Sequence, residues 1–245
     1  MRELSKSIPR RQRDPGFTSR FFVGDGVDIG GAPDPLSLYQ ELFPLLKSVR
    51  VWDLEDGDAQ LMSGVPDNSF DLVHSSHCLE HLHDPRVGLE NWLRICAPGG
   101  HIVITVPDED IYEQGIFPST YNHDHKWTFT SHKNKSWSEK SINLMSLVED
   151  LGDSCQLISL RLEDSAYRYQ LPRFDQTSTP VAESCWELVL RKRTSQELED
   201  LGLRTFKNSH TTHLNQYFNQ YKLDYQTLKA ANKVSKPFSN FEDLT

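Results

Sequence analysis

The stretch SSHCLEHLHDP, from Ser75 to Pro85, carries the densest set of chemically active side chains in the sequence. His77 and His81 lie four residues apart, and Glu80 directly precedes the second histidine. This H-x-x-E-H order holds a metal ion in proteins that present it on a long helix. The same groups can also donate and accept protons near neutral pH. The stretch therefore predicts either a metal site or the polar wall of a binding site.

A second group of reactive side chains lies in the polar segment Tyr112–Lys133, which is rich in Tyr, His, Trp and Phe. Long connections in compact domains are often functional. His123-Asp124-His125 combines a base of suitable pKa with a carboxylate that can orient it. We expect His123 or His125 to act as a catalytic base and Asp124 to orient it. A surface loop with scattered histidines is the structural alternative.

Acidic residues and glycines mark two further points. Asp28 precedes Gly30-Gly31 in VDIGGAPD, and Asp53 is the second residue of WDLEDGDAQ, about twenty residues later. Glycines at a strand end let the backbone approach a ligand closely. No lysine follows them as in a P-loop, so phosphate binding is not expected.

Short apolar runs alternate with helical patterns along the chain. The runs predict strands at residues 26–29, 49–54, 70–74, 102–106, 155–164 and 186–193. Leucines between residues 38 and 46 predict one helix, Asp84-Pro85 begins another, and residues 141–152 form a third. This alternation predicts an α/β fold with a mainly parallel sheet covered on both faces. Ligands bind at the carboxyl ends of such strands, which selects the loops after Ile29, Trp52 and Val73.

Three motifs occur in the order VDIGGAPD, WDLEDGDAQ and DNSFDLVHSSHCLEHLHDP…LRICAPGGHIVITVPD. Together they resemble the class I S-adenosylmethionine-dependent methyltransferases, in the group that acts on small molecules. The resemblance covers roughly Val23 to Pro107. It implies a Rossmann-like sheet and S-adenosyl-L-methionine as cofactor. Asp53 and Asp58 are only five residues apart, whereas the family usually has a helix and a strand between these positions. Either the third strand is lost here or one acid has no role.

The resemblance also implies roles for individual residues. Asp28, Gly30 and Gly31 would lie at the methionine half of the cofactor, and Asp53 would accept both ribose hydroxyls. Asp58 and Ala59 match the pair at adenine. The histidine-rich stretch becomes the loop beside the cofactor, with Ser75, Ser76 and His77 lining the site. Glu80 and His81 would hold the turn by hydrogen bonds. In this context we expect no metal ligand.

The chain divides into a basic arm at residues 1–20, a methyltransferase domain at 21–193 with a substrate-binding insertion at about 108–140, and a helical tail at 194–245. The arm is expected to be solvated, and the tail is where we expect any homo-oligomer contact. A formal charge of −9 in 245 residues disfavours nucleic acid and anionic lipid as partners. Four separated cysteines, no secretory signal and no membrane-spanning run suggest a reduced cytoplasmic protein.

The expected activity is methyl transfer to a small polar acceptor, through a hydroxyl or an amine, with a sugar or glycan end as one option. An amine acceptor would need no strong base. Two alternatives remain. His77 and His81 could serve a zinc-dependent hydrolase, or the chain could be a non-catalytic scaffold, because its glycine motif is reduced to GGAPD.

Overall fold

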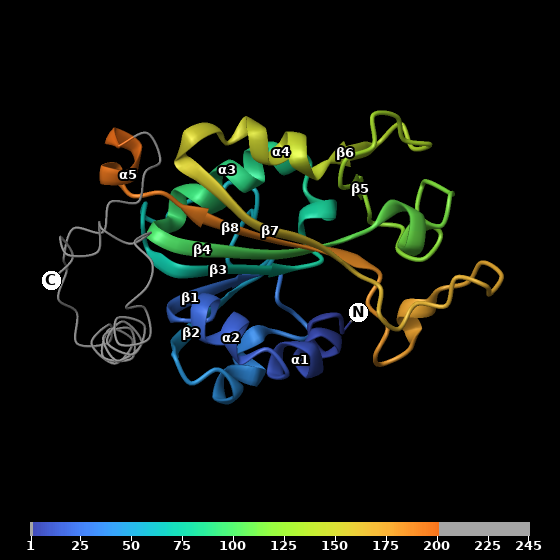
Figure 1. Ribbon diagram of the computed structural model, residues 1–245, viewed down its shortest axis with the longest axis horizontal. Coiled ribbons are helices and arrows are strands. Elements are labelled where there is room, and N and C mark those ends of the chain that lie inside the picture. The colour runs from blue at the N-terminus through green and yellow to red at the C-terminus, as the bar shows by residue number, and fades with distance from the viewer. Residues whose placement is uncertain (1, 201–245) are drawn as a thin grey trace, which may run out of the picture. The chain divides into compact units, whose positions relative to one another are not determined.

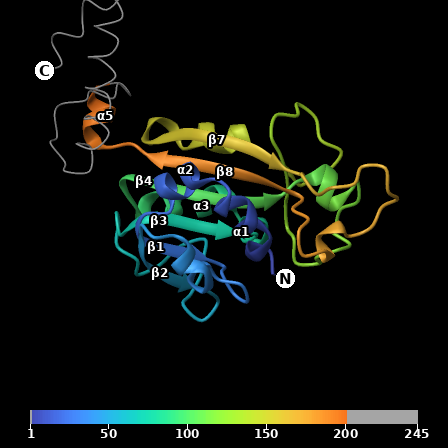
Figure 2. The same cartoon turned by 60° about the horizontal axis from the view of Figure 1, so that its bottom comes forward.

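A computed structural model describes residues 2–200 of the chain. Its centre is a six-stranded sheet with the order β2-β1-β3-β4-β8-β7 (Figures 1 and 2). The strands are β1 (Gly24–Ile29), β2 (Leu46–Trp52), β3 (Phe70–Ser76), β4 (Cys96–Pro107), β7 (Cys155–Glu163) and β8 (Cys185–Lys192). The first four are parallel, and β8 runs antiparallel to both of its neighbours. The predicted α/β, Rossmann-like and mainly parallel sheet is confirmed.

Helices cover both faces of the sheet, as predicted (Figure 1). On one face lie α1 (Leu4–Gln12), α2 (Pro15–Phe21) and the 3-10 helix η1 (Leu36–Leu42); on the other lie α3 (Pro85–Ile95) and α4 (Leu144–Asp150). Each face has its own apolar core, built around Phe22 and Phe43 on the first and around Trp92 and Leu89 on the second. Both cores use side chains that alternate along the shared strands.

Local sequence explains why α3 begins where it does. Asp84 is the N-cap, and its carboxylate accepts hydrogen bonds from the backbone amides of Arg86 and Val87. Pro85 occupies the first helical position, where its missing N–H costs nothing. The helix therefore fixes the end of the histidine-rich stretch against the sheet.

The sheet is shortened at its β2 edge. No strand occurs in the 17 residues between Trp52 and Phe70, and β2 is the outermost strand of the sheet. The third strand that the family usually has is therefore absent between β2 and β3. Of the two interpretations of the close spacing of Asp53 and Asp58, the loss of this strand is confirmed.

Two predictions of local structure are wrong. The leucines at 38–46 were expected to form one face of an α-helix, but residues 36–42 form a 3-10 helix in which Leu38 and Leu42 are exposed, and Leu45 is exposed in the turn that follows. The basic arm is not solvated, because Lys6 and Arg11 are buried on α1.

The segment after β4 forms a separate lobe at the end of the sheet to which the arrowheads of β3 and β4 point (Figure 2). It contains the one-turn π-helix η3 (Glu109–Glu113) and a two-stranded sheet of β5 (Thr128–Thr130) and β6 (Ser141–Asn143). It spans the residues, about 108–140, where a substrate-binding insertion was predicted, and a role in substrate binding stays a prediction.

The described chain closes with α5 (Ser195–Glu199), which begins with a capping box between Thr194 and Glu197. Burial alone would raise the pKa of Glu197, but hydrogen bonds from Arg191 and from Thr194 lower it to about 2. Most of the predicted helical tail, residues 201–245, lies outside the described residues. No helix between residues 2 and 200 is long and apolar enough to cross a membrane.

Candidate active site

A cavity of about 320 Å³ lies at the carboxyl ends of β1, β2 and β3. Loops after these strands form its floor, α1 contributes one wall, and the insertion contributes another. The lining residues are Glu3, Leu4, Asp28, Gly30, Gly31, Ala32, Asp34, Asp53, Leu54, Ser76, His77, Cys78, His81, Tyr112, Asn122, Asp124 and His125. The cavity therefore lies where ligands bind in open α/β sheets.

Asp28 and the glycines after it form the turn at the end of β1. One carboxylate oxygen of Asp28 accepts a hydrogen bond from the Leu36 amide at 2.6 Å. Gly31 has no room for a side chain, because a Cβ atom there would lie 2.5 Å from that same oxygen. Gly30 has φ +71° and packs its Cα against Cys78. These glycines are needed for the tight turn itself.

A buried chain of polar contacts connects this turn to the N-terminal helix. The other oxygen of Asp28 lies 2.5 Å from Nδ1 of His74, and Nε2 of His74 lies 3.1 Å from Nη1 of Arg11. Arg11 also pairs with Glu187 on β8 at 3.2 Å. Burial alone would raise the pKa of Glu187, but Arg11 and Arg10 outweigh burial and lower it. The chain of contacts holds α1 against the sheet beside the cavity.

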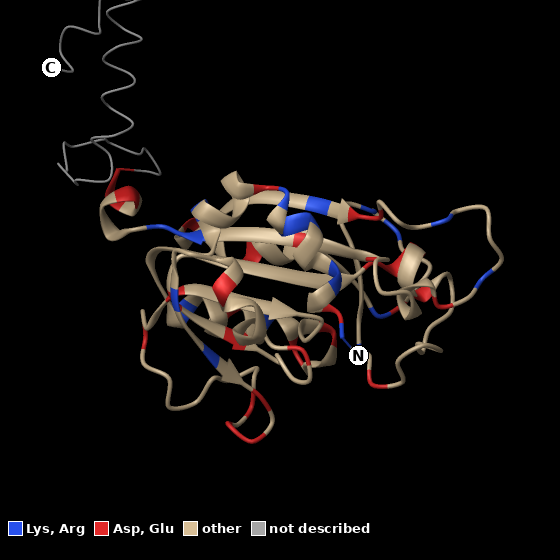
Figure 3. Ribbon diagram, turned by 90° about the horizontal axis from the view of Figure 1, so that it is seen from below, with Lys and Arg blue, Asp and Glu red and all other residues tan. Residues whose placement is uncertain are grey.

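Asp53 lies at the tip of β2 and is partly exposed to the cavity. One of its oxygens accepts a hydrogen bond from the Ala32 amide and the other from the Leu54 amide, each at 2.8 Å. Further acidic residues follow it in the exposed loop after β2 (Figure 3). Asp58 caps the amide of Gln60 and does not line the cavity.

Ala59 also lies away from the cavity, since its carbonyl accepts a hydrogen bond from the indole of Trp92. The structure therefore does not bring the predicted adenine pair, Asp58 and Ala59, to the site.

Some residues at the end of β3 are buried in the fold, and others line the cavity. Ser75 is buried, and its hydroxyl donates to the Ile29 carbonyl, so it does not line the cavity. Ser76 and His77 do line it. His77 has φ +56°, and burial lowers its pKa well below the usual value for histidine. Its Nδ1 lies 3.3 Å from the Ser76 hydroxyl. The alternative of a zinc hydrolase paired His77 with His81, whereas the group of described residues that could hold a metal ion contains His81 but not His77.

The histidines of the insertion have different environments. His123 is exposed and does not line the cavity, whereas His125 is buried in its wall. Nδ1 of His125 lies 2.7 Å from Glu113, on η3. Burial acts to lower the pKa of His125, but the hydrogen bond to Glu113 and the nearby carboxylates raise it. Asp124, predicted to orient this histidine, instead lies 2.9 Å from Nδ1 of His81.

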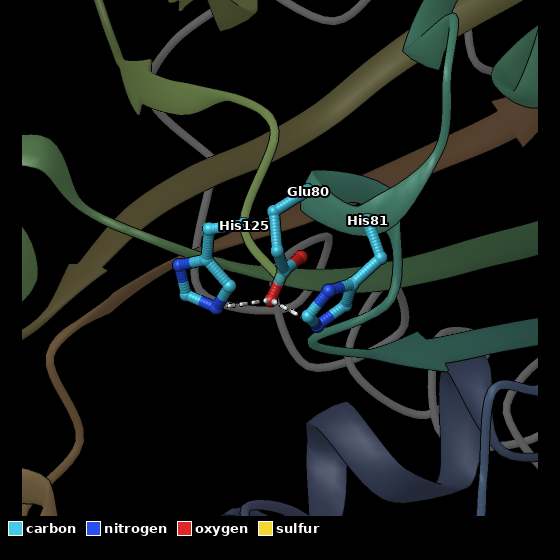
Figure 4. A group of neighbouring side chains, drawn as sticks. All are labelled: Glu80, His81 and His125. Atoms are coloured by element: carbon cyan, nitrogen blue, oxygen red, sulfur yellow. Dashed lines mark ion pairs between the residues drawn. The ribbon is translucent and has the colours of Figure 1, made fainter. Parts of the chain in front are cut away.

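Sequence reasoning missed Glu113 because it lies twelve residues before His125 and belongs to no motif. It also assigned Glu80 to hydrogen bonds that hold the turn. Glu80 is fully buried, and neither carboxylate oxygen has a hydrogen-bond partner within the described residues. Burial raises its pKa. The Nε2 atoms of His81 and His125 flank it (Figure 4).

The cavity is acidic. Five carboxylates line it, and no lysine or arginine of the described chain does; the five are Glu3, Asp28, Asp34, Asp53 and Asp124. Such a lining attracts a positively charged ligand and repels a phosphate.

Comparisons with known proteins agree with this architecture. The family model described as a methyltransferase domain matches residues 15–152. An uncharacterized methyltransferase of Schizosaccharomyces pombe is 36% identical over 59 residues, which are 24% of this chain and 20% of that protein. Ajmaline N-methyltransferase of Rauvolfia serpentina is 34% identical over 79 residues, covering 32% of this chain and 26% of that enzyme. The chain thus matches only a fifth to a quarter of the length of these relatives.

Solved structures show a looser likeness. The N-methyltransferase NodS of Bradyrhizobium japonicum is 17% identical, with a TM-score of 0.46 over 76% of this chain and 97% of that chain. A SAM-dependent methyltransferase of Archaeoglobus fulgidus is 18% identical, with a TM-score of 0.47 over 78% and 95%. The match to the family model spans more than half of the sequence. The chain therefore belongs to the methyltransferase-domain family.

Proposed function

We propose that the protein is an S-adenosylmethionine-dependent methyltransferase that acts on a small polar acceptor. One observation carries the proposal beyond family membership. A single cavity joins the strand-end residues Asp28, Gly31 and Asp53 to the buried His125 of the insertion. A cofactor half and an acceptor half thus share one space, whose volume falls within the roughly 300–1,000 Å³ usual for small-molecule sites.

The residues present fit this cofactor. S-adenosylmethionine supplies a methyl group on a cationic sulfonium and also carries an ammonium group, and the acidic lining suits both. Asp53 would hold the ribose hydroxyls, since a carboxylate has about four acceptor sites and the Ala32 and Leu54 amides use two. Leu54 is 92% exposed at the rim and offers an apolar surface to the adenine ring. Asp28, with both oxygens engaged, would hold the turn rather than the ligand.

The acceptor half would use the wall formed by Tyr112, His81 and His125. In methyl transfer to a hydroxyl, an oxygen lone pair forms the new bond to carbon. The carbon–sulfur bond breaks with its electrons returning to sulfur, and the hydroxyl proton leaves. Positioning the oxygen in line with the departing sulfur is the main task of the protein. His125, which lines the cavity, rather than the exposed His123 is the histidine suited to accept the hydroxyl proton.

The test is calorimetric titration of the full chain with S-adenosylmethionine and with S-adenosylhomocysteine. We expect one site for each ligand, followed by methyl transfer to some hydroxyl- or amine-bearing compound in a radiolabel screen. Failure of both ligands to bind at millimolar concentration would refute the enzyme and favour the non-catalytic scaffold. Binding without transfer to any acceptor would leave a cofactor-binding protein with no methyltransferase activity.

A further inference from the structure

Glu80 is a buried carboxylate that lacks a hydrogen-bond partner among the described residues. Its exposed fraction is 0%, and neither oxygen accepts a hydrogen bond from another described residue. An ionised carboxylate in such a place is costly unless a cation compensates it. Glu113, a second buried carboxylate, lies on the far side of His125 and leaves its own Oε2 without a hydrogen-bond partner. Two buried carboxylates, each with an oxygen that accepts no hydrogen bond within the described residues, thus lie beside His125.

Two histidine nitrogens flank one oxygen of Glu80 (Figure 4). Oε1 of Glu80 lies 4.0 Å from Nε2 of His81 and 3.9 Å from Nε2 of His125. The three ligand atoms all lie within 4.8 Å of one another. These gaps are too long for hydrogen bonds. In the plane of the three atoms, the point equidistant from them lies at most about 2.5 Å from each, so shifts of a few tenths of an ångström give the roughly 2.0–2.2 Å of zinc bonds to nitrogen and oxygen.

Each histidine has a carboxylate on its other nitrogen. Nδ1 of His125 lies 2.7 Å from Glu113, and Nδ1 of His81 lies 2.9 Å from Asp124. A carboxylate accepts the Nδ1 proton and leaves the lone pair on Nε2, which is the tautomer that binds a metal. Histidine ligands almost always carry such a partner, which fixes the ring orientation. The two pairs therefore aim both lone pairs toward Glu80.

Backbone contacts hold the two segments in this arrangement. The Lys126 amide donates to the Glu80 carbonyl at 2.9 Å, and the Lys126 ammonium donates to the His81 carbonyl at 2.6 Å. The Trp127 indole donates to the Leu82 carbonyl at 3.0 Å. The ligand atoms are therefore brought together by the fold on two segments more than forty residues apart.

We propose that Glu80, His81 and His125 bind a divalent transition-metal ion at the wall of the cavity. Two imidazoles and one carboxylate suit Zn²⁺, Fe²⁺, Co²⁺ or Mn²⁺, whereas an all-oxygen set would suit Mg²⁺. The ion compensates the buried charge of Glu80. This differs from the sequence-based expectation of no metal, which considered His77 as the partner of His81 and could not foresee His125.

The ion also defines a class of acceptor, and this step rests on the proposed methyltransferase function. Three protein ligands leave coordination positions open. Because His81 and His125 both line the cavity, an open position can face the acceptor. A hydroxyl oxygen held there would lose its proton to water in the cavity more easily, since a bound cation lowers the pKa of an oxygen ligand. The acceptor would then be an alcohol or diol, and His125 would serve as a ligand rather than as the base.

The test is titration of the metal-free full-length protein with Co²⁺ and Zn²⁺, followed by calorimetry and by the visible spectrum of Co²⁺. We expect one ion per chain. Glu80→Gln and His81→Gln should each weaken binding at least tenfold, and Asp124→Asn should weaken it roughly 10- to 100-fold as a partner of a ligand. His83→Gln, which changes an exposed histidine of the same segment, should leave affinity unchanged. Circular dichroism and S-adenosylhomocysteine binding report whether each variant is folded.

The outcomes separate this site from the proposed function. No stoichiometric ion in the parent would overturn the metal site, and so would equal affinity in folded Glu80→Gln. If the ion binds as expected but S-adenosylhomocysteine does not, the metal site stands and the methyltransferase function fails. If only S-adenosylhomocysteine binds, the proposed function stands and the metal site is refuted.

Discussion

Replacing Asp53 by alanine should weaken binding of S-adenosylhomocysteine about 10- to 100-fold. Hydrogen bonds to a charged group contribute about 1.5–3 kcal/mol, and each 1.4 kcal/mol corresponds to about tenfold in affinity. Asp53 is partly exposed, and its oxygens already accept from the Ala32 and Leu54 amides. The two ribose hydroxyls would share the remaining acceptor sites, so we assign about 1.5–3 kcal/mol to both hydrogen bonds together.

Calorimetric titration with S-adenosylhomocysteine measures this effect without turnover. Asp58→Ala is the matched control, because Asp58 is an exposed acid five residues further on that does not line the cavity. We expect its affinity to change less than twofold. Urea unfolding of both variants tests whether the amides freed in Asp53→Ala loosen the loop. An Asp53→Ala protein that binds as tightly as the parent would remove Asp53 from the site, and a large effect of Asp58→Ala would restore Asp58 to the adenine position.

Three further predictions concern stability, measured by urea denaturation. Arg11→Met should lower the free energy of unfolding by about 3–5 kcal/mol, because it breaks the buried ionic contact with Glu187. The control Arg13→Ala changes an exposed residue and should alter the free energy of unfolding by less than about 0.5 kcal/mol. Equal effects of the two substitutions would contradict a stabilising role of the Arg11 contact. Gly30→Ala should lower the free energy of unfolding clearly more than Gly64→Ala. Both glycines have positive φ, but only at Gly30 would a Cβ atom lie 2.6 Å from another side chain, that of Cys78. Comparable losses of stability would argue against the tight turn at Gly30. The pKa of Glu197 is lowered from 4.5 to about 2, so its contribution is complete above pH 4.5 and is lost as the pH falls toward 2. Glu197→Gln should therefore flatten the loss of stability between pH 4.5 and 2, and an unchanged pH profile would contradict this.

Local patterns in the sequence were enough to predict the sheet and the end of it that holds the cavity. The strand before Gly30, the Asp84-Pro85 helix start and the acid at Asp53 each depend on neighbouring residues, and they are found as expected. The spacing of Asp53 and Asp58 left two alternatives open, a lost third strand or an acid without a role; the structure has no strand between β2 and β3, and Asp58 does not line the cavity.

Contacts between distant segments could not be predicted. A basic N-terminal segment normally indicates solvation, and nothing near Arg11 reveals that Glu187 will bury it. The same limit applies to the histidines: Glu113 and His125 meet only because the insertion folds back onto η3. Sequence proximity suggested Asp124 as the orienting carboxylate, but Asp124 points to His81 instead. The roles of these residues in catalysis stay predictions.

The buried contacts of α1 have a consequence for the order in which the protein is made. Arg10 and Arg11 lie near the beginning of the chain, yet their partners Glu183 and Glu187 come 173–177 residues later. During synthesis Arg10 and Arg11 therefore lack these two carboxylate partners until the residues up to β8 have emerged from the ribosome. Contacts of such long sequence separation form slowly, because loop closure precedes them. Glu3 and Leu4 of the same segment line the cavity, so part of the cavity wall is held by contacts that form late in folding.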